Sequence, residues 1–102
     1  MEIIRKNSQE ILYVYGIYNI SNNIYYLVKP NNHPGLLSVK ASDANILNNN
    51  ISDGFIFNLK NDGFTLLLKP LENELFLEKL LECDPEAMHR FTEILGTSSN
   101  NK

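Results

Sequence analysis

Few side chains in this sequence are suited to acid–base or nucleophilic chemistry. The candidates are one cysteine, Cys83, and two histidines, His33 and His89. A thiol beside an imidazole is the arrangement used in cysteine-dependent catalysis, and Cys83 lies only six residues before His89. No oxyanion-hole or nucleophile motif flanks the pair. We therefore expect Cys83 to be a half-buried apolar residue and His89 to be a solvated helix residue.

The sequence also lacks the residues that are characteristic of other catalytic or cofactor sites. A tetrahedral metal site needs paired ligands, and a lone cysteine supplies neither such a pair nor a disulfide. Gly54 and Gly63 precede expected strands, whereas a phosphate loop precedes a helix. We expect His33 to brace a loop. The sequence thus predicts a protein that is not an enzyme and has no metal or cofactor, with an enzyme using Cys83 and His89 as an open alternative.

Acidic side chains near the C-terminus form one candidate binding surface. Glu74, Glu78 and Glu82 are spaced four residues apart, which places them on one face of a helix. Like charges at this spacing cost a helix about a few tenths of a kcal/mol per pair, so the arrangement favours a role in binding a basic partner. Three further acidic residues extend the region: Glu72, Asp84 and Glu86. The alternative is a solvated face of an acidic protein.

The tyrosines form a second candidate surface, because all five fall in the first expected hairpin. Tyrosine is favoured at protein interfaces, where it brings a rigid apolar body and a polar tip. It is also a good strand residue, so a half-buried sheet face is the alternative. The five are Tyr13, Tyr15, Tyr18, Tyr25 and Tyr26. We take Tyr18 and Tyr25 as the partner-binding pair.

Length and charge limit the classes of protein that fit. The 102 residues suit one domain, which we expect over residues 1–96, followed by a disordered polar tail over residues 97–102. Six basic and five acidic side chains give +1 over residues 1–70, and three against seven give −4 over residues 71–102. A nucleic-acid binder needs a basic face, so no nucleic acid is expected as partner. No signal peptide or membrane span is evident, which predicts a cytoplasmic protein without membrane contact.

Short apolar runs between turn signals predict an antiparallel sheet of about five strands. Asp53-Gly54 and Asp62-Gly63 are turn pairs, and each launches an apolar run too short for a helix. The earliest strand is apolar on both faces, so it lies centrally or is covered on its second side, and Gly16 within it indicates a bend or bulge. The expected strands span residues 9–20, 24–29, 36–40, 55–60 and 64–69.

Two further N-terminal segments are less regular. Residues 1–8 have the pattern of a short strand or an ordered arm. Ser42 is expected to cap a single helical turn that ends at residues 48–50.

Two helices are predicted at the C-terminus. The first covers residues 73–82, and Leu75 lies outside the apolar arc that is expected to be buried opposite the acidic face. The residues of that arc are Phe76, Leu77, Leu80 and Leu81. The second begins with Asp84 as N-cap and Pro85 at its first position, and Gly96 is expected to end it. The fold class is therefore α+β, with the two C-terminal helices packed on one face of the sheet. A free strand edge makes either a monomer or a homodimer compatible with the pattern.

In size, acidity and composition the whole chain resembles the small immunity proteins that neutralise bacterial toxins. Its fifteen asparagines, concentrated in expected loops, are typical of an AT-rich bacterial or phage gene. The resemblance implies one-to-one binding of a cognate toxin, often a nuclease with a basic active-site cleft, through the acidic helix face. Two alternatives are a phage or accessory-element inhibitor of a host protein and a small domain of pleckstrin-homology type that binds lipid or peptide.

Overall fold

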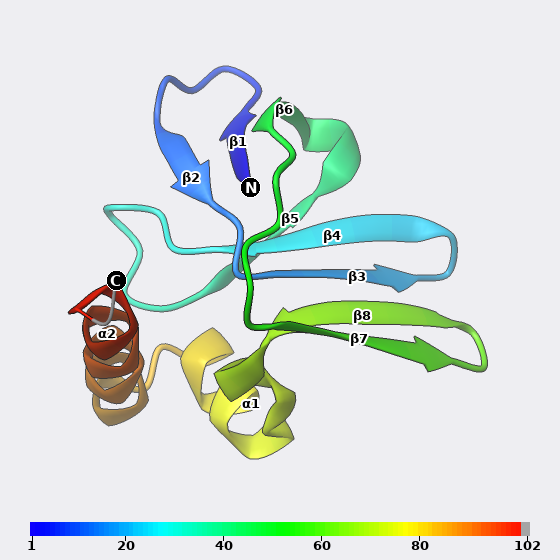
Figure 1. The fold of residues 1–102 in the computed structure, drawn as a ribbon. Coiled ribbons are helices and arrows are strands. Elements are labelled where there is room, and N and C mark those ends of the chain that lie inside the picture. The colour runs from blue at the N-terminus through cyan, green and yellow to red at the C-terminus, as the bar shows by residue number, and fades with distance from the viewer. Residues whose placement is uncertain (101–102) are drawn as a thin grey trace.

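Two antiparallel sheets and two C-terminal helices form three layers (Figure 1). The computed structural model describes residues 1–100 of the chain, and the side chains of residues 1–96. The strands are β1 (Glu2–Arg5), β2 (Ile11–Tyr13), β3 (Gly16–Ile20), β4 (Asn23–Val28), β5 (Leu37–Lys40), β6 (Ala44–Asn48), β7 (Phe55–Lys60) and β8 (Gly63–Leu68). The helices are the 3-10 turns η1 (Ala41–Asp43) and η2 (Lys69–Glu72) and the α-helices α1 (Glu74–Leu81) and α2 (Pro85–Asn100).

The larger sheet has five strands in the order β5-β4-β3-β8-β7, and the smaller has three in the order β2-β1-β6. Every pairing in both sheets is antiparallel. The predicted α+β fold, with a five-stranded antiparallel sheet followed by two C-terminal helices on one face, is confirmed. The three-stranded sheet was not predicted.

The first predicted strand, residues 9–20, is divided between the two sheets. The chain turns a corner at Val14 and Tyr15, where the Val14 N–H donates to Met1 O (3.0 Å) and the Tyr15 N–H donates to Leu27 O (2.8 Å). Gly16 then begins β3, and a Cβ atom at this position would lie only 2.6 Å from a Leu67 methyl group. The prediction of one continuous strand is wrong, whereas the bend expected at Gly16 is present.

Each face of the larger sheet has its own apolar core. The core beneath the smaller sheet comprises Met1, Ile3, Leu12, Val14, Tyr26, Val28 and Val39. The core beneath the helices comprises Leu27, Leu36, Leu67, Leu71, Leu80, Ala87 and Phe91. Strand β4 contributes to both because successive side chains point to opposite faces. The first hairpin is therefore apolar on both faces because one face packs against the smaller sheet and the other packs against the helices.

Residues 44–48 form strand β6, where a helical turn was predicted. The 3-10 turn η1 does occur, but Lys40 precedes it and no side chain caps it, so Ser42 is not a cap. Strand β6 pairs along β1, with Arg5 opposite Ala44 and Ile4 opposite Asn45. Pairing with the open edge of β1 therefore determines the conformation of residues 44–48, since local propensity is weak compared with a ladder of backbone hydrogen bonds.

Caps fix the start of both C-terminal helices. The Asn73 side chain accepts a hydrogen bond from the Phe76 N–H (3.0 Å), and the Asp84 carboxylate accepts one from the Ala87 N–H (2.9 Å). The predicted N-cap at Asp84 is confirmed, but the predicted end at Gly96 is wrong, because α2 continues to Asn100. Residues 101–102 of the predicted tail lie outside the described residues. No helix in the described part of the chain is long and apolar enough to cross a membrane.

Phe91 is the side chain that joins α2 to the rest of the helix-side core. It is fully buried, and its ring meets those of Tyr15 and Phe76 at centroid distances of 5.2 and 6.3 Å. We expect Phe91→Ala to lower the free energy of unfolding by about 3–5 kcal/mol, measured by urea titration. Leu75→Ala is the control, because Leu75 is largely exposed and its loss has little effect on stability. Equal losses in the two variants would contradict the role of Phe91.

Candidate functional site

Helix α1 presents a row of three glutamates to solvent. Its orientation is fixed by the Asn73 cap at one end and by Leu80, which is buried against the sheet. Glu74, Glu78 and Glu82 are all exposed, as the sequence predicts. Within the described residues, none of the three carboxylates forms an ion pair or a side-chain hydrogen bond. No described side chain therefore pairs with the negative charges of this row.

Two exposed leucines flank this row. Leu75 is 63 % exposed and Leu81 is 41 % exposed. At 100° of rotation per residue, the two leucines lie at the two angular borders of the acidic row, Leu75 near the start of α1 and Leu81 at its end. We call these five residues the acidic helix face. Leu81 was expected to be buried with Leu80, and instead it lies at the boundary of the packed side of α1.

Two of the other predicted acidic residues serve the fold. Glu72 is half-buried, and its carboxylate accepts a hydrogen bond of 2.6 Å from the Asn58 side chain on β7. The Asp84 carboxylate caps α2. Glu86 is exposed in the first turn of α2, where a negative charge stabilises the helix dipole. The sequence already identifies Asp84 as a helix cap, but only the tertiary contact with Asn58 reveals that Glu72 is bound.

The structure brings Tyr18 and Tyr25 together, as neighbours on β3 and β4. Their rings stack with centroids 5.4 Å apart and planes 19° from parallel. The Tyr18 hydroxyl also shares a hydrogen bond of 2.5 Å with the Ser38 hydroxyl on β5. Both rings are half-buried on the face of the larger sheet that carries the helices. They therefore form a partly exposed aromatic pair rather than a fully buried one.

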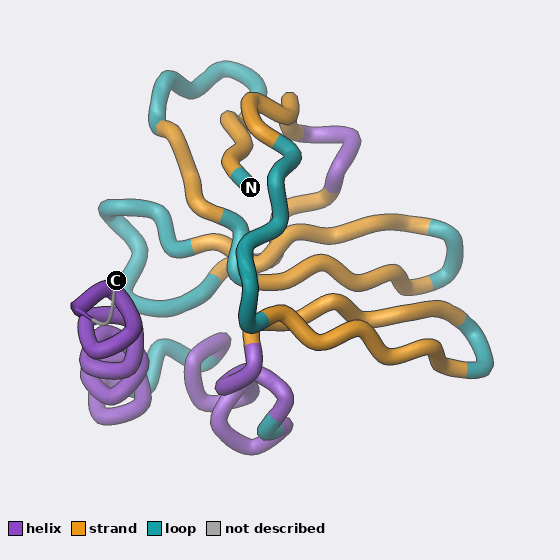
Figure 2. Tube along the Cα trace, viewed as in Figure 1, coloured by secondary structure: helices purple, strands orange, loops and turns teal. Residues whose placement is uncertain are grey.

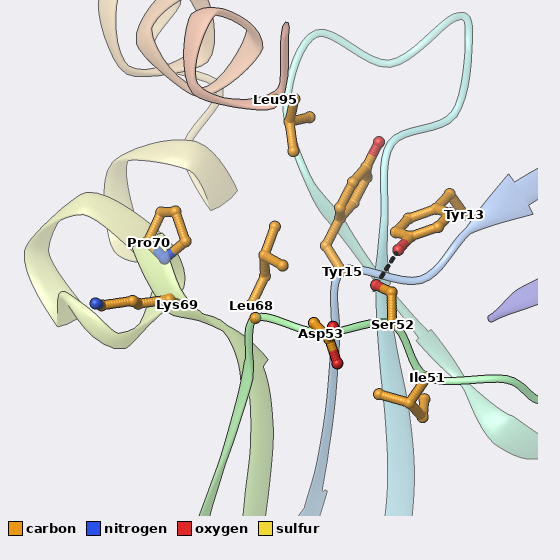
Figure 3. A pocket seen from close by; sticks show the side chains of 10 residues that line it. Tyr13, Tyr15, Ile51, Ser52, Asp53, Leu68, Lys69, Pro70 and Leu95 are labelled. Carbon is orange, nitrogen blue, oxygen red and sulfur yellow. Dashed lines mark hydrogen bonds between the residues drawn. The ribbon is translucent and has the colours of Figure 1, made fainter. Parts of the chain in front are cut away.

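A groove that the sequence did not indicate lies where the two sheets and α2 meet (Figure 3). It has a volume of about 910 Å³ and is lined by Tyr13, Tyr15, Ile51, Ser52, Asp53, Gly54, Leu68, Lys69, Pro70 and Leu95. The Tyr13 hydroxyl shares a hydrogen bond with the Ser52 hydroxyl (3.0 Å), and the Tyr13 and Tyr15 rings lie 4.9 Å apart. One wall comes from the loop over residues 49–54 that leads from β6 to β7 (Figure 2). Because its walls are far apart in sequence, no local motif marks the groove.

The surroundings of Tyr15 displace the pKa of its hydroxyl. Burial in the groove raises the pKa of Tyr15 above its ordinary value, because a phenolate is poorly solvated there. The neighbouring Tyr13 raises the Tyr15 pKa further, since two phenolates repel each other. Tyr15 is thus held in its neutral form, which suits an apolar wall rather than an acid–base role near neutral pH.

The cysteine pairs with a different histidine from the one that the sequence suggested. Cys83 Sγ lies 3.7 Å from His33 Nε2, whereas exposed His89 pairs with Glu93 at 3.8 Å. Next to this contact, the Leu36 N–H donates to Leu80 O (3.0 Å), so the loop before β5 is also bonded to the last turn of α1. His33 therefore braces a loop. No group of three potential metal ligands occurs in the described part of the chain.

No protein-family model, curated protein or solved structure matches this chain.

The raised pKa of Tyr15 leads to a prediction about stability at alkaline pH. A proton bound more tightly in the folded state stabilises the fold at low pH, and this contribution is lost as the pH rises from about 10 through the folded-state pKa. Stability should therefore fall in that range, as measured by urea titration at successive pH values. In Tyr15→Phe the fall should be smaller, because the group whose pKa is raised is then absent. An unchanged fall in Tyr15→Phe would contradict the assignment.

Proposed function

We propose that this protein is a non-enzymatic protein-binding module that binds and neutralises a basic partner through the acidic helix face. The observation that carries the proposal is the row formed by Glu74, Glu78 and Glu82, which is exposed and has no partner among the described side chains. The function is that of an immunity protein, and the partner is a cognate toxin whose basic active-site cleft takes up the row.

The electrostatics of α1 support a partner that supplies cations. Three carboxylates at four-residue spacing repel one another along the helix, and this repulsion is relieved when arginine or lysine side chains lie between them. Charge-assisted hydrogen bonds to such groups contribute about 1.5–3 kcal/mol each. The net charge of −4 over residues 71–102 also speeds the encounter with a positively charged surface.

The leucines of the acidic helix face give the surface an apolar component. The exposed part of a leucine side chain contributes little to the fold, whereas its burial at an interface contributes about 25 cal/mol per Å² of apolar area. Apolar anchors surrounded by charged residues are the usual composition of a protein interface. Leu75 and Leu81 are placed on both sides of the acidic row and supply such anchors.

The remaining predicted residues divide between contact and support. Glu86 extends the contact surface, since its side chain is exposed beside the end of α1. Glu72 and Asp84 support the fold, because their carboxylates are bound to Asn58 and to the first turn of α2. Tyr18 and Tyr25 offer a second, aromatic contact area on the helix side of the larger sheet.

An inhibitor of a host protein, carried by a phage or accessory element, would use the same surface on a different basic partner. The gene beside this one distinguishes the two cases, because an immunity protein is encoded next to its toxin. Both share the central expectation that the acidic helix face is the contact.

Charge reversal of the acidic row tests the proposal. The variant Glu74→Lys/Glu78→Lys/Glu82→Lys is compared with Asp43→Lys/Asp53→Lys/Asp62→Lys, which reverses three exposed carboxylates elsewhere. Each reversal adds two charges, so both variants move from −3 to +3. The partner is first captured from a lysate of the source organism with the parent protein and identified by mass spectrometry, and affinities are then measured by calorimetry.

We expect reversal of the acidic row to weaken binding about a hundredfold or more, because three desolvated pairings become repulsive. The control should change affinity only through its net charge, an effect that falls away as salt is raised. Circular dichroism should show both variants folded. Equal affinity losses in the two variants at moderate salt would place the contact elsewhere.

A further inference from the structure

Strand β7 is an open edge of the larger sheet (Figure 1). With six residues it is the longest of the four edge strands in the described structure, since β2, β5 and β6 have three, four and five. Edge strands are ordinarily protected by a proline, a bulge, a central charge or a covering segment. Residues 55–59 contain no proline or charge, and their pairing with β8 is free of irregularity. The side chains of Phe57 and Leu59 are 59 % and 79 % exposed.

The register of the β7–β8 hairpin determines which backbone groups face outward. The two strands close with Lys60 opposite Gly63, and the Lys69 N–H donates to Gly54 O (2.8 Å) at the other end. Even-numbered residues of β7 therefore direct their N–H and C=O groups towards β8, and odd-numbered residues direct theirs to the open side. Phe57 and Leu59 thus combine outward-facing backbone groups with exposed apolar side chains.

We propose that β7 pairs antiparallel with β7 of a second copy of this chain, joining two five-stranded sheets into one across a two-fold axis at Asn58. This dimer goes beyond the proposed function and does not depend on it. In this register, Phe57 of one copy bonds through its backbone to Leu59 of the other, and the reverse pair forms as well. The two most exposed apolar side chains of the strand then become cross-strand neighbours.

The Asn58 side chain favours this strand register over the registers shifted along the strand. At the two-fold axis the two Asn58 residues form a non-hydrogen-bonded backbone pair, in which side chains approach most closely. Each side-chain amide donates one hydrogen to Glu72 and retains its second hydrogen and its oxygen. The two amides are therefore able to bond each other reciprocally.

Charge complementarity also favours a second copy as the occupant. Lys60 of the second copy lies opposite Ile56, on the sheet face where Asn58 holds the Glu72 carboxylate. Each lysine therefore approaches an acidic group of the other protomer. The two Lys60 side chains are separated by about 13 Å along the strands, beyond the reach of strong repulsion in physiological salt. Helix α1 lies near the start of β7, and the half towards the hairpin tip is clear of helices (Figure 1).

The interface is small, so the dimer is expected to be weak. A few residue pairs per strand bury less than the roughly 1,200 Å² typical of stable complexes, which corresponds to dissociation constants of about a micromolar or weaker. Sedimentation velocity over a wide concentration range should show reversible dimerisation of the parent protein. A single monomeric species at every concentration would overturn the proposal.

The variant Leu59→Lys should raise the dissociation constant about tenfold or more, because two lysines then face the apolar row of the other copy. Leu47→Lys on β6 is the matched control, since Leu47 is 51 % exposed and lies on an edge strand of the smaller sheet. The control should dimerise as the parent protein does. If Leu47→Lys weakened the dimer and Leu59→Lys did not, the interface would not be β7.

Disulfide trapping tests the register. Two cysteines at Asn58→Cys would have Cα atoms about 4.5 Å apart, within the range of a disulfide, and should cross-link under mild oxidation. Asn61→Cys lies at the exposed tip of the same hairpin, where the two copies are about 20 Å apart along the strands and should not cross-link. Half-buried Cys83 is present in both variants, so any cross-linking through Cys83 contributes equally to both. Cross-linking of Asn61→Cys as fast as Asn58→Cys would overturn the proposed pairing.

Discussion

The burial of both faces of the β3–β4 hairpin is the constraint on which the rest of the structure depends. Tyr26 and Val28 face the smaller sheet, and Leu27 between them faces the helices. Both the smaller sheet and the helices are required, because removing either layer would expose a row of large apolar side chains to water. The corner at Val14 and Tyr15 makes this possible, since it lets one segment of chain supply strands to two sheets. A chain of 102 residues thereby builds two cores around one central hairpin.

The same layering determines what is left on the surface. Leu80 and Phe91 attach the helices to one face of the larger sheet, and the acidic row of α1 is consequently turned outward. The smaller sheet covers only part of the opposite face, so the outer strand of the β7–β8 hairpin keeps exposed apolar side chains. The acidic helix face and the β7 edge therefore differ in chemistry. The acidic helix face suits a basic partner, and the β7 edge suits an uncharged strand.

Polar side-chain contacts connect segments of the fold that are distant in the chain. Asn58 and Glu72 join β7 to the turn before α1, and His33 and Cys83 join the loop before β5 to the turn after α1. At Gly63 the close approach of the Asn19 side chain, which accepts from the Phe64 N–H (2.6 Å), leaves no space for a Cβ atom. Its φ is not in the left-handed region, so this glycine is required by tertiary packing rather than by the turn itself.

The sequence by itself determined the elements that depend on neighbouring residues. Asp-Gly turn pairs followed by short apolar runs identified β7 and β8, the Asp84-Pro85 pair identified the start of α2, and four-residue spacing identified the exposed row at Glu74, Glu78 and Glu82. Only the tertiary structure decided which elements meet: the division of residues 9–20 between two sheets, the pairing of β6 with β1, the bond between Glu72 and Asn58, and the groove around Tyr15. The physical reason is that periodicity and capping act within a few residues, whereas strand pairing and side-chain contacts join segments that are distant in the chain.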